Sequence, residues 1–144
     1  MLDIKTTVEI SGNEALDPID FTPLMESLSQ LLVSQTQDRI ATQNQSPTGE
    51  KWHPWSSKYA KTRKSNHSLL ISGGTLLQSI YGQSTENEAI AGSNMLYARI
   101  HQKGGQTGRN HAATIPARPY LGLSEDNKAE VRSVVLDYLQ HHQK

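Results

Sequence analysis

Residues 22–41 read TPLMESLSQLLVSQTQDRIA, and this stretch decides the fold. Its apolar side chains recur at spacings that place them on one face of a helix, with the polar side chains mostly elsewhere. The apolar positions are Leu24, Leu28, Leu31, Leu32 and Ile40. Thr22 and Pro23 predict the helix start, because a threonine hydroxyl caps a free amide and proline has no amide to leave unsatisfied. The pattern predicts a long amphipathic helix over residues 23–41.

The sequence on both sides of this helix predicts a sheet and a second helix. Residues 2–10 alternate between apolar or threonine side chains on one face and mostly charged ones on the other, which is typical of a half-buried strand. Residues 81–94, YGQSTENEAIAGSN, predict a hairpin with residues 86–88 at its tip. Ser124 precedes two acidic residues and predicts the start of a helix over residues 125–141.

These elements predict an α+β fold, in which two principal helices pack on a small, largely antiparallel sheet. The 144 residues match the length of one domain, so we expect residues 1–144 to form a single domain with long mobile loops. Only 35% of the residues are hydrophobic. We therefore expect a modest core and some apolar contact with a partner chain.

The connecting segments are polar and rich in glycine. Residues 42–50 contain the Ser-Pro and Thr-Gly pairs that are typical of loops. Residues 69–80, LLISGGTLLQSI, predict a turn followed by one or two helical turns. Residues 95–104 predict a helix that ends at Gly104. Residues 103–114 predict a polar loop of about twelve residues.

The net charge of zero conceals two regions of opposite sign. Residues 1–50 carry eight acidic and two basic side chains, a net charge of −6. Residues 51–124 carry nine basic and two acidic side chains, a net charge of +7. Opposite charges on different parts of one surface favour head-to-tail association of copies, or steering toward a polyanion. The alternative is that the two regions fold against one another and neutralise locally.

Composition excludes several classes of protein. The chain has no cysteine, which excludes disulfides, thiolate zinc sites and cysteine nucleophiles. No stretch approaches the roughly 18 consecutive apolar residues of a membrane span, and the start, MLDIKTTVEI, lacks the layout of a secretory signal. We expect a protein that is made in the cytoplasm, stays soluble and contacts no membrane.

Residues that perform enzymatic chemistry are present, but not in catalytic patterns. The six histidines include no His-x3-His pair. There is neither a Gly-x-Ser-x-Gly motif nor a phosphate-binding glycine loop. We therefore expect no catalytic residue, no metal, no cofactor and no enzymatic activity. A hydrolase that uses His101 or His111 is a remaining alternative, for which the sequence suggests no substrate.

Residues 51–64 combine cations with aromatic side chains and contain no acid. The cations are Lys51, Lys58, Lys61, Arg63 and Lys64, and the aromatics are Trp52, Trp55 and Tyr59. Ser56 is placed to cap a short helix, which we expect to be mobile in an isolated subunit. Large aromatics commonly anchor protein interfaces, which is the interpretation we favour. The alternative is a small nucleic-acid-binding protein whose aromatics stack on bases while its cations neutralise phosphates.

Four segments, taken in order, resemble the phage virion morphogenesis family, which includes the tail completion proteins of contractile-tailed phages and a related protein of phage Mu. The segments are residues 47–52 with Gly49 and Trp52, residues 69–80 with Gly73 and Leu76, residues 91–104 with Gly92, Tyr97, His101 and Gly104, and residues 115–124 with Pro116, Arg118, Pro119 and Gly122. With the flanking helices, the resemblance spans most of residues 20–140.

The resemblance implies a structural subunit that acts late in tail assembly, as a ring at the head-proximal end of the tail or at the head–tail joint. The implied partners are copies of itself and the tail terminator, tail tube or head-connector proteins, and contact with DNA in the channel is left open. The implied location is the tail or neck of the virion. Of the expected interface residues, the resemblance carries over Trp52, Tyr97, His101 and Arg118, and the aromatic segment adds Trp55 and Tyr59. The expected structural turns are at Gly49, Gly73, Gly104, Pro116 and Pro119.

Arg118 has two interpretations at this stage. It lies in an extended stretch between Pro116 and Pro119, whose stiffness suits a bidentate contact with a neighbouring protein. The alternative is an ion pair within the subunit.

Overall fold

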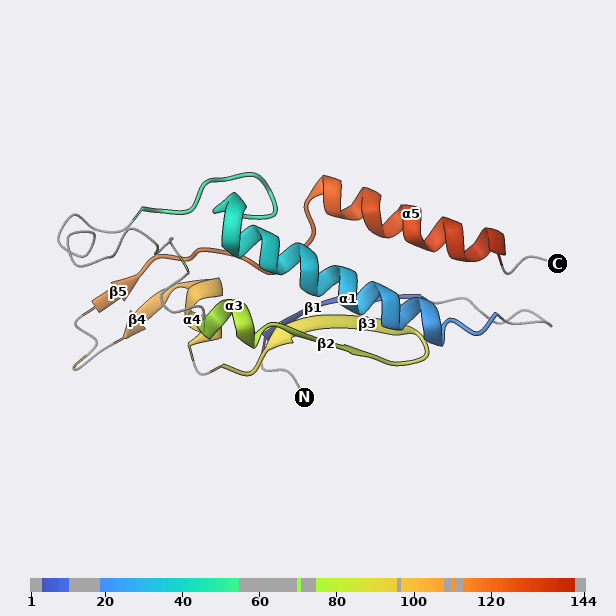
Figure 1. Ribbon diagram of the computed structural model, residues 1–144. Helices are drawn as coiled ribbons and strands as arrows, with labels where there is room; N and C mark the ends of the chain where they lie inside the picture. Colours follow the sequence, from blue (N-terminus) through green and yellow to red (C-terminus); the bar gives the residue numbers. More distant parts are fainter. Residues whose placement is uncertain are drawn as a thin grey trace.

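The predicted amphipathic stretch forms helix α1 (Thr22–Asp38), which contacts the sheet and a second long helix. The computed structural model describes residues 4–10, 19–54, 70, 75–95, 97–107, 110 and 113–141 (Figure 1). The fully buried side chains of α1 include Leu24, Leu28 and Leu32, as the spacing predicts. After Asp38 the helix widens into a π-helical turn, η1 (Arg39–Gln43).

The start of α1 differs by one residue from the prediction. Thr22 is the first helical residue, and no side chain caps the helix from the position before it. Instead, Asp20 Oδ1 accepts a hydrogen bond from the backbone N–H of Thr22 at 3.0 Å. This bond lowers the pKa of the Asp20 carboxyl. A negative charge is also favoured at this end of a helix, so the carboxylate takes over the role expected of the threonine hydroxyl.

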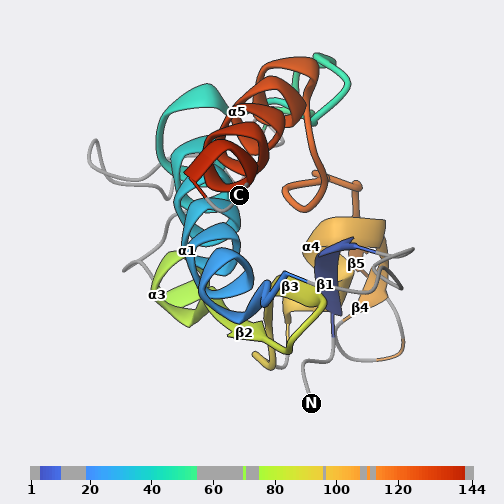
Figure 2. The ribbon, with the colours of Figure 1, turned by 90° about the vertical axis from the view of Figure 1, so that its right-hand side faces the viewer.

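The predicted strand and hairpin form one antiparallel sheet with the order β1-β3-β2. Strand β1 (Ile4–Glu9) pairs with β3 (Glu88–Ser93), and β3 pairs with β2 (Tyr81–Ser84). The register aligns the buried Ala89 and Ala91 with the side of β1 that carries Val8 and Thr6. Both principal helices lie on this side of the sheet (Figure 2).

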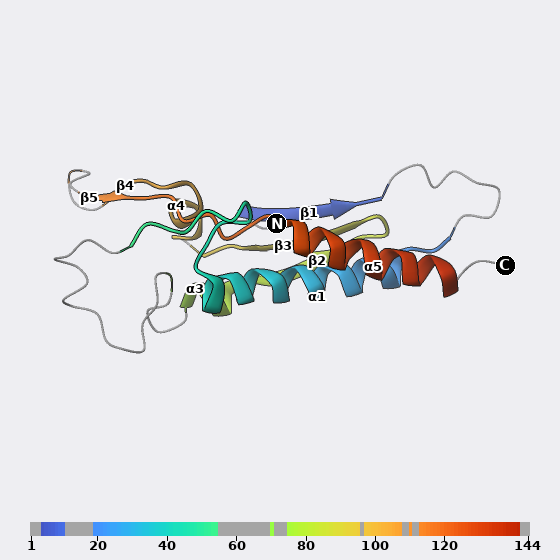
Figure 3. The same ribbon diagram turned by 90° about the horizontal axis from the view of Figure 1, so that it is seen from above.

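Helix α5 (Glu125–His141) lies antiparallel to α1 (Figures 1 and 3). Ser124 begins it, as predicted: its Oγ accepts from the N–H of Asn127 at 3.0 Å, and Asn127 Oδ1 accepts from the N–H of Ser124 at 3.1 Å. The apolar side chains of α5 that face α1 are only half-buried, Leu136 is exposed, and Asn127 is the one buried residue of the helix. These two helices and the small sheet confirm the predicted α+β class.

The shorter elements gather at one end of the molecule. Helices α3 (Thr75–Ser79) and α4 (Ala98–Lys103) form where short helices were predicted, and α4 ends at Gly104. The loop predicted for residues 103–114 was wrong in part, because β4 (Gly105–Thr107) and β5 (Ala113–Ile115) pair antiparallel within it. These short strands have almost no apolar alternation and are joined by backbone hydrogen bonds. The helix predicted after Ser56 and the turn at Gly73 lie outside the described residues.

Gly92 allows β1 to approach β3 closely. A Cβ atom at this position would lie 2.0 Å from the carbonyl oxygen of Ile4, whereas one at Gly82 would lie 3.1 Å from the Ser29 side chain of α1. We predict that Gly92→Ala lowers the free energy of unfolding by about 3 kcal/mol and Gly82→Ala by about 1 kcal/mol. Chemical denaturation of both variants measures the difference. Equal losses would contradict the observed register of β1 on β3.

Candidate functional site

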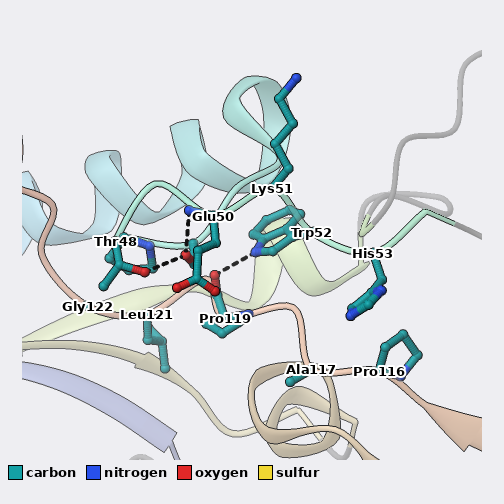
Figure 4. A pocket seen from close by; sticks show the side chains of 12 residues that line it. Thr48, Glu50, Lys51, Trp52, His53, Pro116, Ala117, Pro119, Leu121 and Gly122 are labelled. Carbon is teal, nitrogen blue, oxygen red and sulfur yellow. Dashed lines mark hydrogen bonds between the residues drawn. The ribbon is translucent and has the colours of Figure 1, made fainter.

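Two loops, residues 44–54 and 116–122, enclose a groove of about 630 Å³ beside α4 (Figure 4). Three prolines and the Trp52 ring contribute to its walls, and charged side chains stand at its edge. The lining residues are Ser46, Pro47, Thr48, Glu50, Lys51, Trp52, His53, Pro116, Ala117, Pro119, Leu121 and Gly122. Mostly apolar walls with a polar rim are typical of a protein-binding surface.

Trp52 joins the two loops. Its indole is 5% exposed and belongs to the core cluster that includes Tyr120 and Leu121. The indole Nε1–H donates to the carbonyl oxygen of Pro119 at 2.8 Å. A buried indole N–H needs such an acceptor, so this bond fixes residues 116–122 relative to residues 44–54. Trp52 therefore forms a wall of the groove, and its only polar atom is hydrogen-bonded within the subunit.

The 44–54 loop begins with a tight turn. The N–H of Ser46 donates to the Glu50 carbonyl at 2.7 Å, and the N–H of Gly49 donates to the Ser46 carbonyl at 2.9 Å. Gly49 has a φ of 94°, in the left-handed region. Pro47 in this turn packs against Gly122, where a Cβ atom would lie 3.0 Å from its ring.

Arg118 is 7% exposed and holds the end of the 44–54 loop. Its Nε donates to the His53 carbonyl at 2.8 Å and its Nη2 to the Pro54 carbonyl at 3.2 Å. The guanidinium fork thus makes a bidentate contact, but with backbone of its own chain. These bonds lie within the subunit and go to carbonyl oxygens, and the expected contact of Arg118 with a neighbouring protein stays a prediction.

Helix α4 supports the 116–122 loop from below. Gln102 Oε1 accepts from the N–H groups of Tyr120 and Leu121, both at 2.9 Å, and the Tyr120 hydroxyl donates to the Ala98 carbonyl at 2.7 Å. The N–H of Arg118 donates to the His101 carbonyl at 2.8 Å. Gly104 has a φ of 72°, and a Cβ there would lie 2.7 Å from the nitrogen of Ala117. Only glycine accommodates this close approach of α4 to the loop.

His101 is half-buried on α4, close to Arg118. Burial lowers the pKa of its imidazole, and the positive charge of Arg118 lowers it further. Its Nδ1 is buried and has no hydrogen-bond partner within the described part of the chain. The neutral imidazole is therefore the form that this site favours.

Tyr97 differs from the other predicted interface residues that the structure describes. Its side chain is 55% exposed, immediately before α4. Trp52 and Arg118 are buried and fix the groove walls, and His101 is half-buried behind them. Pro116 and Pro119 line the groove. Trp55, Tyr59 and Gly73 lie outside the described residues.

Sequence reasoning missed Arg39 as well as Gln102. Arg39 is fully buried at the end of α1, and its Nη1 donates to the Tyr120 carbonyl at 2.6 Å. Its Nη2 donates to Asn127 Oδ1 on α5. Burial lowers the pKa of this guanidinium, while the charge of Asp38 opposes that shift. The available signal was position, since Arg39 lies seven residues after Leu32 on the buried face of α1.

Among the described residues, no group of three or more histidine, aspartate or glutamate side chains is placed to hold a metal ion. In the same part of the chain, no helix has both the length and the apolar character needed to cross a membrane.

Comparison with known proteins identifies the family. The sequence model of the phage virion morphogenesis family matches residues 5–140. The chain belongs to this family. The resemblance found in the four sequence segments is thereby confirmed, and with it a role in the assembly of phage particles.

The relatives are proteins of phage Mu and Mu-like prophages. The chain is 32% identical over 109 residues to the putative capsid assembly protein G of Escherichia phage Mu, covering 72% of this chain and 70% of that protein. It is 42% identical over 71 residues to the FluMu G protein 2 of Haemophilus influenzae, covering 49% of this chain and 51% of that protein. The FluMu G protein 1 is 31% identical over 109 residues, covering 72% and 70%. No solved structure matches the chain.

The fork of Arg118 gives a test of how the groove is held. Arg118→Lys keeps the charge but replaces the planar fork, which donates from two nitrogens, with a shorter side chain that has one nitrogen, so we predict a loss of about 1–2 kcal/mol in the free energy of unfolding. Arg132→Lys, at an exposed position of α5, is the matched control and should change stability little. Urea denaturation compares the two variants. A loss no larger than that of the control would show that Arg118 does not hold residues 53 and 54.

Proposed function

We propose that this protein is a non-enzymatic virion subunit that completes the tail or joins it to the head, acting as a ring of identical copies at the head-proximal end of the tail. The supporting observation is the groove, whose walls are fixed by hydrogen bonds from side chains to backbone. Trp52, Arg118 and Gln102 each hold a loop that would otherwise have many conformations. A loop ordered in advance loses less entropy when it binds, which suits a docking surface.

The groove also favours a protein partner. Five of its twelve lining residues are proline, leucine or tryptophan, and Glu50, Lys51 and His53 also line it. The apolar lining residues can bury apolar surface of a partner protein, and the charged lining residues can fix the orientation in which that partner docks. The phage Mu relative is described as a putative capsid assembly protein, and by extension we propose virion proteins as the partners of this chain.

The charge distribution supports association of identical copies. Residues 1–50 are net acidic and residues 51–124 net basic. In a ring, each subunit presents different surfaces to its two neighbours, so opposite charges meet at every contact. The proposed location is therefore the neck or the head-proximal end of the tail, with the tail terminator, tail tube or head-connector proteins adjoining the ring.

Tyr97 gives the most direct test. In a lysate that lacks the native protein, we predict that heads and tails accumulate unjoined, and that added wild-type protein restores infectious particles. Tyr97→Asp should restore fewer than about one in a hundred of them, because a charge replaces an exposed aromatic anchor, and Tyr97→Phe should act as wild type. Equal thermal stability of the two variants confirms that only the surface has changed.

Association of the wild-type protein with itself and with tails gives a second test of the proposal. Light scattering of the wild-type protein, alone and mixed with purified tails, measures its association. A protein that stays monomeric, sediments with neither tails nor heads and restores no infectivity would contradict the proposal. Salt-sensitive binding to free DNA without any effect on joining would support a nucleic-acid-binding protein instead.

A further inference from the structure

A second cleft, distinct from the groove, lies between the C-terminal half of α1 and the first turns of α5. It has a volume of about 520 Å³, and its walls are mainly polar. The lining residues are Leu31, Ser34, Gln35, Asp38, Gln43, Gln45, Ser124, Asp126, Asn127 and Glu130. Three of these are acidic and none is basic, so the cleft concentrates negative charge.

None of the three carboxylates forms a contact ion pair within the described part of the chain, although the charge of Asp38 acts on the neighbouring Arg39. Asp38 accepts hydrogen bonds from the neutral side chains of Thr42 at 2.8 Å and Gln43 at 2.5 Å. Lys128 pairs with Glu125, which does not line the cleft. The nearby guanidinium of Arg39 is buried and donates to Tyr120 and Asn127. The hydrogen bonds orient Asp38 without neutralising it, which leaves the cleft able to bind a cation.

Gln35 provides a second, independent indication of a missing donor. Its side chain is 6% exposed and lines the cleft. Its Nε2 donates to the Asn127 carbonyl at 3.3 Å and to Glu130 Oε1 at 3.4 Å, but its buried Oε1 accepts no hydrogen bond within the described residues. A buried acceptor without a donor costs free energy. An ammonium or guanidinium group that enters the cleft would pair with the carboxylates, and a rotation of the buried Gln35 amide would bring Oε1 to that donor.

We propose that this cleft binds the part of the basic segment that follows Pro54, residues 55–64, of a neighbouring copy of the chain. These residues carry four cations and no acid, which complements a cleft with three acids and no base. The inference rests on the proposed ring and specifies its contact. Because cleft and segment belong to different parts of one chain, the contact is head-to-tail and repeats from copy to copy until the ring closes.

The path of the chain favours a neighbour over the same copy. Gln45 lines the cleft, but from there the chain runs away from α5 and toward β5 (Figure 1). Arg118 then holds it at His53 and Pro54, and His53 lines the groove (Figure 4). The basic segment of the same copy therefore begins at a point directed away from its own cleft.

Charge reversal on each side tests the contact. Asp126→Lys with Glu130→Lys reverses the cleft at two exposed positions, and Lys61→Glu with Lys64→Glu reverses the segment. We predict that each double variant weakens self-association at least about tenfold, and that mixing the two variants restores it to within about threefold of wild type, as a coupled pair requires. Glu9→Lys with Glu26→Lys, at exposed positions outside the cleft, is the matched control for net charge. Sedimentation of the full-length protein at about 0.1 M salt measures association.

The outcomes separate this contact from the proposed function. If both reversed variants associate as wild type does, or if the mixture fails to recover, the cleft contact is overturned while the tail-completion role stands. If the wild-type protein restores infectivity but never self-associates, the contact is likewise overturned, and the partner is another virion protein. If Lys61→Glu with Lys64→Glu abolishes binding to DNA but leaves self-association unchanged, the cleft contact is overturned and the segment binds nucleic acid instead.

Discussion

The buried guanidinium of Arg39 is the interaction on which the arrangement of the other elements depends. It joins the end of α1, the 116–122 loop and the first turn of α5 through the carbonyl of Tyr120 and the side chain of Asn127. Burying a charge is costly unless hydrogen bonds replace its water. Two neutral acceptors do so here for the Nη groups, whereas the buried Nε–H has no hydrogen-bond partner within the described residues. Asn127 also caps α5 through Ser124. The same side chain therefore begins α5 and holds it on α1.

This contact explains how α5 stays on α1 although it buries little apolar surface. The apolar side chains of α5 that face α1 are only half-buried, so the hydrophobic contribution to its docking is limited. Polar anchoring at the first turn compensates and leaves the acidic cleft open between α5 and α1. On the other side of the 44–54 loop, Trp52 and Arg118 hold the groove by the same means, hydrogen bonds from a buried side chain to backbone. A modest core thus supports two concave surfaces of different chemistry.

Periodic elements could be predicted from the sequence, whereas side-chain-to-backbone contacts could not. Apolar spacing predicted α1, β1, the β2–β3 hairpin and α5, because burial on one face leaves a regular pattern. The β4–β5 pair was missed because its short strands have little apolar alternation. Arg39 was counted only as a charge, and Gln102 only as part of a segment that resembles the family, because the hydrogen-bond partners of such side chains are recognised only once the fold places them. The family was predicted from segments that contain Trp52, Tyr97 and Arg118. The sequence alone does not show that Trp52 and Arg118 are buried whereas Tyr97 is exposed.

Amide hydrogen exchange of Arg39→Met, compared with the wild-type protein, tests the central role of this guanidinium most directly. Methionine fills similar space but leaves the Tyr120 carbonyl without its donor, at a cost of about 1–3 kcal/mol. The account predicts that protection falls along α5 while the amides of α1 and β3 keep theirs, because α5 opens as a local unit. Unchanged protection of α5 in the variant would contradict it.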